Sequence, residues 1–182
     1  MPWRKRTHRI EIAQVCDSLR TGKQVSIMWK GGVRVIVLDD EERMLLVKQH
    51  HEDRDIWMVP GGGILDDEGA DEAAVREVKE ETGVDISVDG LLWHVEEVSE
   101  RGQRFVNFFM AHVAGPQMEP SLGSDPELAE DAQVLREVRF MSRDEMAKLE
   151  VFYPEYLKDE FWELREEGKL KYNAFRLRER RK

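Results

Sequence analysis

The chain has 182 residues, of which 41% are hydrophobic and 36% charged, enough apolar material for the core of one domain beneath a well-solvated surface. Its formal net charge of −10 argues against a broad nucleic-acid-binding surface, since phosphate backbones need basic patches. The single cysteine, Cys16, excludes an intrachain disulfide, and no apolar run approaches the roughly 20 residues of a membrane span, so we expect a cytoplasmic protein.

The first predicted elements lead into a strongly apolar hairpin. Residues 8–20 favour a strand or a short helix and residues 25–29 a strand, so we expect residues 1–24 to form an extension of the domain. Two apolar, β-rich runs at 33–38 and 44–49 flank an acidic turn, which is the signature of a hairpin. Their nearly continuous apolar character predicts burial on both faces.

A glycine-rich break separates this hairpin from the rest of the fold. Pro60 and the three glycines after it interrupt regular structure, and a helix is predicted over 71–82 with Gly83 at the C′ position. The remaining predicted elements are strands at 91–98, 105–113 and 134–142, a loop at 114–127, and helices at 143–150 and 153–168. Strands interrupted by helices predict a sheet covered by helices, an α/β or α+β domain.

Both ends of the chain are basic. Residues 3–6 and 176–182 concentrate Lys and Arg in an otherwise acidic chain, and we expect residues 169–182 to form a basic C-terminal tail. We interpret both basic segments as solvated or frayed termini, with an anion-binding or partner-docking tail as the alternative.

The helix at 71–82 concentrates charge of one sign. Glu77, Glu80 and Glu81 are three and four residues apart, so at about 100° per residue they project from one face. The apolar positions that we expect to face the sheet are Ala74, Val75 and Val78. Two ionised carboxylates about 4 Å apart repel by roughly 4 kcal/mol at an effective dielectric constant of 20. The acidic face is therefore either simply solvated or bridged by cations.

The glycines upstream of the helix favour bridging by cations. Oxygen ligands suit hard divalent cations such as Mg²⁺ or Mn²⁺. Glycines let the backbone approach a metal or a phosphate closely. Carboxylates beside a glycine loop are the parts that metal-assisted attack on a phosphate ester or anhydride requires.

The spacing of these residues resembles the signature of the Nudix hydrolases at every fixed position. Gly62 is followed after five residues by Glu68, after seven more by Arg76-Glu77-Val78, and then by Glu80-Glu81 and Gly83-Val84. The resemblance implies an α/β/α sandwich with a mixed sheet, which we assign to residues 25–168, and hydrolysis of a nucleoside diphosphate linked to another group. It also implies Mg²⁺ as the cofactor, with Mn²⁺ as a substitute, a small nucleotide as the partner, and homodimer contacts made by the N-terminal extension.

The resemblance assigns a role to each residue of the signature. It implies that Glu77 and Glu81 bind metal, with Glu80 as a third ligand or a water contact and the Gly61 carbonyl as a further ligand. Arg76 resembles the arginine that orients the glutamates. An ordinary ion pair between Arg76 on the helix and Glu68 on the loop is the alternative, and it is compatible with that role. Together, Arg76, Glu80 and Glu81 are the predicted catalytic residues. Supporting roles are implied for Gly62, Glu68 and Gly83.

The sequence leaves the substrate open. Asp67 stands where the family commonly has glycine, and the proline and tyrosine typical of relatives acting on ADP-ribose and on dinucleoside polyphosphates are missing. ADP-ribose, a nucleotide sugar or a nucleoside triphosphate would fit, and a noncatalytic Nudix-fold module that senses a nucleotide or docks a protein is the alternative. Candidate substrate-binding residues, each also readable as ordinary core or surface, are Trp57, Arg101, Arg104, Phe109, Glu127 and Glu130. His50 and His51 lie on the strand that leads to the site.

Overall fold

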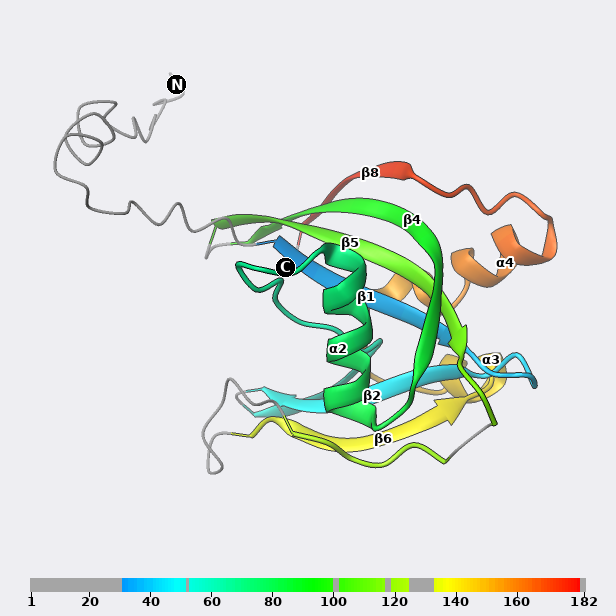
Figure 1. Cartoon of the computed structure of the whole chain (residues 1–182). Coiled ribbons are helices and arrows are strands. Elements are labelled where there is room, and N and C mark those ends of the chain that lie inside the picture. The colour runs from blue at the N-terminus through cyan, green and yellow to red at the C-terminus, as the bar shows by residue number, and fades with distance from the viewer. Residues whose placement is uncertain (1–30, 52, 100–101, 117–118, 125–132, 181–182) are drawn as a thin grey trace, which may run out of the picture.

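The computed structural model describes residues 31–180 apart from 52, 100–101, 117–118 and 125–132 (Figure 1). In chain order its elements are β1 (Gly31–Leu38), β2 (Met44–His51), β3 (Arg54–Met58), α2 (Ala70–Thr82), β4 (Ile86–Ser99), β5 (Gly102–Val113), β6 (Leu135–Met141), α3 (Arg143–Ala147), β7 (Phe152–Tyr153), the 3₁₀ helix η2 (Glu155–Leu157), α4 (Glu160–Glu166) and β8 (Ala174–Arg180). The elements predicted at 8–20 and 25–29 lie outside the described residues. No helix in the described part of the chain is long and apolar enough to cross a membrane.

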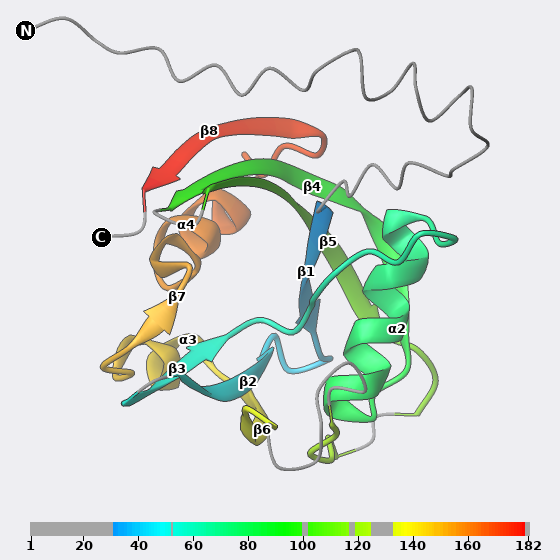
Figure 2. The same cartoon turned by 90° about the vertical axis from the view of Figure 1, so that its left-hand side faces the viewer.

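One mixed sheet contains all the strands of the described residues, in the order β7-β3-β2-β1-β5-β4-β8, with β6 also paired to β2. The predicted hairpin of β1 and β2 is confirmed, and its antiparallel register joins Leu38 to Met44 beside the turn. Beyond this point β1 runs parallel to β5, whereas β2 pairs with β3 and β6. The two strands therefore diverge, and the sheet curls around one side of the molecule (Figure 2).

The glycine loop, residues 60–63, lies against the part of β1 that is no longer paired with β2. The Val33 N–H donates to the Gly62 carbonyl and the Val35 N–H to the Pro60 carbonyl, each at 2.9 Å. Gly61 has φ 139°, and a Cβ at this position would overlap the backbone carbonyl of Val33. Only glycine fits such a conformation and such a contact, so the loop is anchored to the sheet by its own backbone.

Helices cover both faces of the sheet, and each face has its own core. On one side α2 packs on alternate residues of β1, which include Val33, Val35 and Val37. On the other side α3, η2 and α4 pack on a larger cluster that includes Phe108 and Phe161 (Figure 2). This layering agrees with the predicted α/β/α sandwich with a mixed sheet.

The central helix matches its prediction closely. α2 spans Ala70–Thr82, and Gly83 ends it in the left-handed conformation with φ 69°. Its buried positions are Ala73, Ala74, Glu77, Val78, Glu81 and Thr82. The prediction that Val75 faces the sheet is wrong: its side chain is exposed, because it lies about 100° around the helix from Ala74. The buried stripe instead includes two of the three glutamates.

The C-terminal part departs most from the predicted elements. The helix expected over 153–168 is replaced by η2 and the shorter α4, after a cis peptide bond before Pro154. The interruption between η2 and α4 falls at Asp159, the N-cap of α4, whose backbone leaves the helical range with φ −124°. The side chains of Leu157 and Phe161, in these two shorter elements, are nevertheless fully buried in the core.

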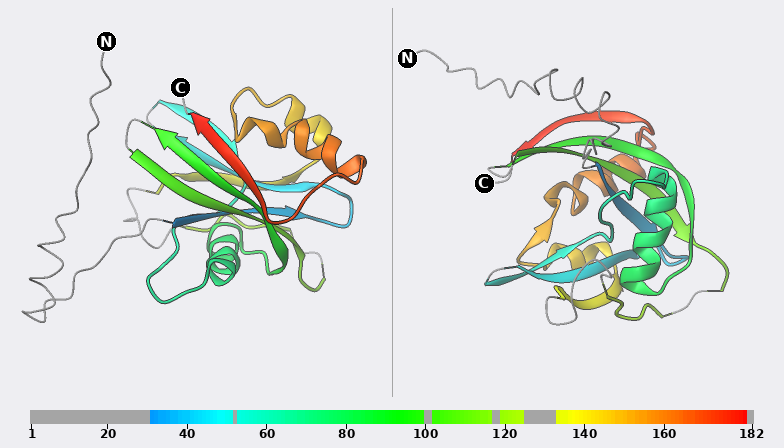
Figure 3. Two further views of the ribbon diagram at one scale, coloured as in Figure 1. Left: turned by 90° about the horizontal axis from the view of Figure 1, so that it is seen from above. Right: turned by 60° about the vertical axis from the view of Figure 1, so that its left-hand side comes forward.

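The basic C-terminal segment contains the last strand of the sheet. The expectation of a solvated or frayed tail is wrong for Ala174–Arg180, which forms β8 parallel to β4, with Trp93 opposite Ala174 (Figure 3). Leu170 and Ala174 pack against the core under α4. Pairing with β4 gives the backbone of this segment hydrogen-bond partners that a tail would take from water.

Candidate active site

Glu77 and Glu81 point from α2 toward the glycine loop. They are only 8% and 5% exposed, although both are acidic. A Cβ on Gly62 would lie 2.5 Å from Oε1 of Glu77, so only glycine leaves room for this carboxylate. Buried carboxylates need hydrogen-bond donors. The structure therefore explains the first glycine of the signature by the position of a glutamate fifteen residues later.

The Glu81 carboxylate accepts hydrogen bonds from two different elements, the glycine loop and β2. Its Oε2 accepts the backbone N–H of Gly61 at 2.9 Å. Its Oε1 accepts the side-chain amide of Gln49 on β2 at 3.2 Å. The loop, the helix and the second strand thus meet at this one carboxylate.

Arg76 is the cation within the acidic cluster. Its guanidinium donates to Glu68 at 2.6 and 2.9 Å, to Glu77 and Glu80 at 3.0 Å each, and to the Gly63 carbonyl at 2.8 Å. The hydrogen bond to Glu68, followed by the charge of Glu77, raises the pKa of Arg76 well above its ordinary value. The hydrogen bond from Arg76 in turn lowers the pKa of Glu68. The repulsion expected from the sequence is therefore offset by a residue of the same helix.

The carbonyl of Gly61 also has a cationic partner. Nη1 of Arg34, on β1, donates to this carbonyl at 2.6 Å and to that of Val59 at 3.3 Å. Arg34 was not among the residues singled out from the sequence. Its guanidinium holds the backbone of the loop just before the first glycine of the signature.

The donor atoms of this cluster fit a hard divalent cation by their chemistry. Glu77, Glu80 and Glu81 contribute carboxylate oxygens and Gly61 a carbonyl oxygen, the ligand types that Mg²⁺ and Mn²⁺ prefer. Within the described residues no three His, Cys, Asp or Glu side chains converge in the manner of a metal site. Glu77 and Glu80 instead share Arg76.

The predicted residues of the signature are thus brought together. Gly83 is further from the chemistry: it ends α2 and lies against the side chain of Ser121. The candidates Arg101, Glu127 and Glu130 lie outside the described residues, as does the side chain of Arg104. Phe109 is buried in the core beneath α2, as its alternative reading had it.

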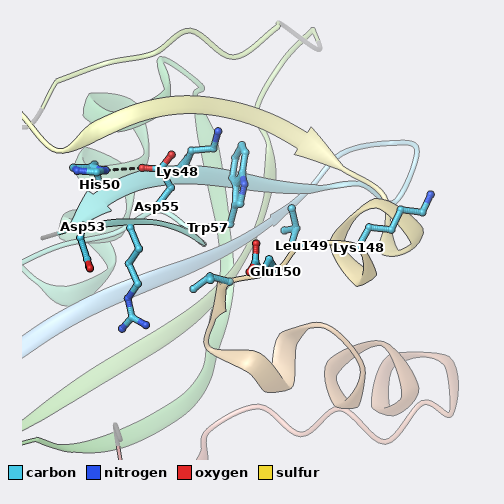
Figure 4. A pocket seen from close by; sticks show the side chains of 10 residues that line it. Lys48, His50, Asp53, Asp55, Trp57, Lys148, Leu149 and Glu150 are labelled. Carbon is cyan, nitrogen blue, oxygen red and sulfur yellow. Dashed lines mark hydrogen bonds and ion pairs between the residues drawn. The ribbon is translucent and has the colours of Figure 1, made fainter.

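Trp57 belongs to the face of β2 and β3 that points away from Glu81. It pairs with Lys48, and paired residues share a face, whereas Gln49, the next residue of β2, points to the opposite face. Nζ of Lys48 lies 5.0 Å from the centre of the Trp57 ring. Lys48, His50, Trp57 and Leu149 line a pocket of about 550 Å³ (Figure 4). Trp57 as a substrate-binding residue stays a prediction, and the structure does not bring it to the glutamates.

A comparison with known families identifies this arrangement. A model of the NUDIX domain matches residues 28–159, which include the glycine loop, α2 and most of the sheet. This chain belongs to the Nudix family. The resemblance drawn from the spacing of the signature is therefore confirmed.

Individual Nudix relatives match over shorter stretches. A Bacillus subtilis (strain 168) protein provisionally named an 8-oxo-dGTP diphosphatase is 48% identical over 56 residues, 31% of this chain and 36% of that protein. The mouse (Mus musculus) 8-oxo-dGDP phosphatase NUDT18 is 31% identical over 123 residues, 64% of this chain and 37% of that protein. The chain thus spans little more than a third of the length of these relatives.

Solved structures agree on the Nudix fold. A NUDIX hydrolase from Nitrosomonas europaea superimposes with a TM-score of 0.61 at 20% identity, over 79% of this chain and 93% of that protein. At this identity the likeness concerns the fold alone, and it confirms the predicted fold class.

Proposed function

We propose that this protein is a Mg²⁺-dependent Nudix pyrophosphohydrolase that cleaves the diphosphate linkage of a nucleoside diphosphate derivative. The observation that carries the proposal is the set of carboxylates held against the glycine loop, with Glu77 on Gly62 and Glu81 on the Gly61 amide. Carboxylates on a rigid helix beside a loop of closely approaching backbone provide both the cation ligands and a phosphate-facing surface.

Glu77, Glu80, Glu81 and the Gly61 carbonyl would hold the metal. Bound Mg²⁺ neutralises phosphate oxygens and orients or activates water for attack on phosphorus. Arg76 aligns Glu77 and Glu80, because it donates to both from their own helix. Glu81, buried and held by the Gly61 N–H and the Gln49 amide, would bind the metal or accept a proton from the attacking water.

The names of these two relatives, among several that match, support an oxidised guanine nucleotide as the first substrate to test. Both names refer to 8-oxoguanine nucleotides, one a deoxynucleoside triphosphate and one a diphosphate. We therefore place 8-oxo-dGTP and 8-oxo-dGDP first, with ADP-ribose, nucleotide sugars and ordinary nucleoside triphosphates as the other candidates. The small nucleotide is the only partner that the proposal requires.

A nucleotide panel tests the proposal directly. The purified protein is incubated with each candidate and Mg²⁺, and the products are separated by ion-exchange chromatography. We expect cleavage between two phosphorus atoms of at least one nucleotide, with no turnover when EDTA replaces Mg²⁺. The proposal is wrong if no nucleotide is cleaved, and nucleotide binding by calorimetry without cleavage would point to the noncatalytic sensing module instead.

A further inference from the structure

Gln49 is a buried polar residue that the signature does not contain. It lies on β2, is 9% exposed, and donates through Nε2 to Oε1 of Glu81. Its own Oε1 lies 2.9 Å from Nε2 of His51, two residues along the same strand. These three side chains form a chain of hydrogen bonds that runs from the surface to a buried carboxylate of the signature.

Strand geometry explains why Gln49 and His51 act together and His50 does not. Side chains at positions i and i+2 of a strand share a face, whereas the residue between them points to the other. His50 accordingly contacts Asp55, at 2.7 Å, on the face that carries the pocket of Figure 4. The strand thus provides two adjacent histidines in opposite environments.

A β-bulge marks the position of Gln49. The register between β2 and β6 shifts between Lys48 and Gln49, from Lys48 opposite Glu137 to Gln49 opposite Leu135. The residue skipped is Arg136, so the bulge lies in β6, whereas β2 keeps an unbroken register with β3. The side chain of Gln49 therefore points toward Glu81 through the ordinary alternation of β2, opposite an irregular stretch of β6.

The direction of each hydrogen bond follows from the groups involved. An ionised carboxylate only accepts, so Gln49 must present its NH₂ group to Glu81. A flipped amide would set two acceptors against each other. With its NH₂ group toward Glu81, Gln49 turns its oxygen toward Nε2 of His51, so the histidine completes the chain of hydrogen bonds as the tautomer with its proton on Nε2.

We propose that Gln49 is a positioning residue for Glu81, and that His51 fixes the orientation of the Gln49 amide. The proposal rests on the proposed function, in which Glu81 binds the metal or accepts a proton. Two donors from separate elements restrict a flexible glutamate to one position, the Gly61 N–H at one oxygen and Gln49 at the other. The amide carries no net charge, so it restrains Glu81 without neutralising it, as a lysine or an arginine would.

Four variants test this role: Gln49→Leu, Gln49→Glu, His51→Ala and, as the matched control, His50→Ala. For each we would measure kcat and KM on the best nucleotide of the panel, the dissociation constant of Mn²⁺ by calorimetry, and the melting temperature. Loss of an outer partner of a metal ligand typically costs 10- to 100-fold in activity or metal affinity. We expect Gln49→Leu to lower kcat or the Mn²⁺ affinity by that factor, with KM within about threefold and the melting temperature within a few degrees of wild type.

The other variants separate positioning from packing. Gln49→Glu is nearly isosteric but sets a second carboxylate against Glu81, so it should lower kcat or the Mn²⁺ affinity more than Gln49→Leu does. If Gln49 acted through packing alone, Gln49→Leu would cause the larger loss. His51→Ala should cost roughly 2- to 10-fold, the value of one hydrogen bond, and His50→Ala nothing measurable.

Two outcomes would overturn the role of Gln49: wild-type kcat and Mn²⁺ affinity in Gln49→Leu, or equal losses in His50→Ala and His51→Ala. A wild-type protein that hydrolyses no nucleotide refutes the proposed function alone. In that case the Mn²⁺ affinity of Gln49→Leu still tests the positioning role. A lower affinity than that of the wild type supports the role, and an unchanged affinity refutes it.

Discussion

Replacing Gly62 with alanine should separate catalysis from folding. The added Cβ would lie 2.5 Å from Oε1 of Glu77, where ordinary contact begins at 3.4 Å, so the carboxylate must retreat by about 0.9 Å. The atoms in the way belong to the end of a flexible side chain, and Gly62 does not have a positive φ. The backbone therefore accepts alanine, and the whole perturbation falls on Glu77.

A shift of about 1 Å at a group that positions the reacting atoms costs on the order of 100-fold in rate. We expect kcat of Gly62→Ala to fall by about that factor, while the free energy of unfolding changes by less than about 1 kcal/mol, because replacing glycine also restricts the unfolded chain. Initial rates on the best nucleotide of the panel and urea denaturation measure the two quantities.

The adjacent glycine provides the matched control. A Cβ on Gly63 would have no atom within 4 Å, so Gly63→Ala should keep nearly wild-type activity. Wild-type activity in Gly62→Ala, or an equal loss in Gly63→Ala, would show that the position of Glu77 against the loop does not matter for catalysis.

Three further predictions concern the helix and its partners. Glu81→Gln should lower kcat by about 100-fold or more with an unchanged circular dichroism spectrum, and full activity would remove Glu81 from the chemistry. Arg76→Gln should destabilise the protein by about 2–3 kcal/mol in urea denaturation, because it leaves the carboxylates of Glu68, Glu77 and Glu80 without their shared cation; unchanged stability would contradict that reasoning. Arg76 lowers the pKa of Glu68 below its ordinary value of 4.5, so the stability that this ion pair provides is fully present at neutral pH and is lost as the pH falls below about 4.5. Glu68→Gln should therefore flatten the decline of the melting temperature in acid, and an identical decline would exclude this contribution.

The elements with strong local signals could be predicted from the sequence. The apolar runs of β1 and β2 and the glycine that ends α2 have short-range causes, so their positions were predicted correctly. The five residues of β3 and the seven of β8 carry many charges and little alternation, and they are strands because neighbouring strands pair with them. Pairing between distant segments leaves no period in the sequence.

The same distinction applies to the candidate site. The three glutamates and Arg76 lie within one helix, so their spacing revealed a common face. Gln49 and Arg34 reach the site from strands 32 and 27 residues away from their partners in the chain. The one available signal was a glutamine shortly after the apolar run of β2, next to Lys48, and only the sheet register shows that it points toward α2.

The alternation of β2 lets a single strand serve two sites without connecting them. Even-numbered positions such as Lys48 and His50 border the pocket, whereas Gln49 and His51 face the carboxylate, so changes to the pocket can accumulate while the neighbours of Glu81 stay constant. The arrangement tolerates substitution but not a change of length. Removing one residue from the turn before β2 would exchange the two faces, with His50 brought to the place of Gln49 beside Glu81 and the glutamine carried to the pocket.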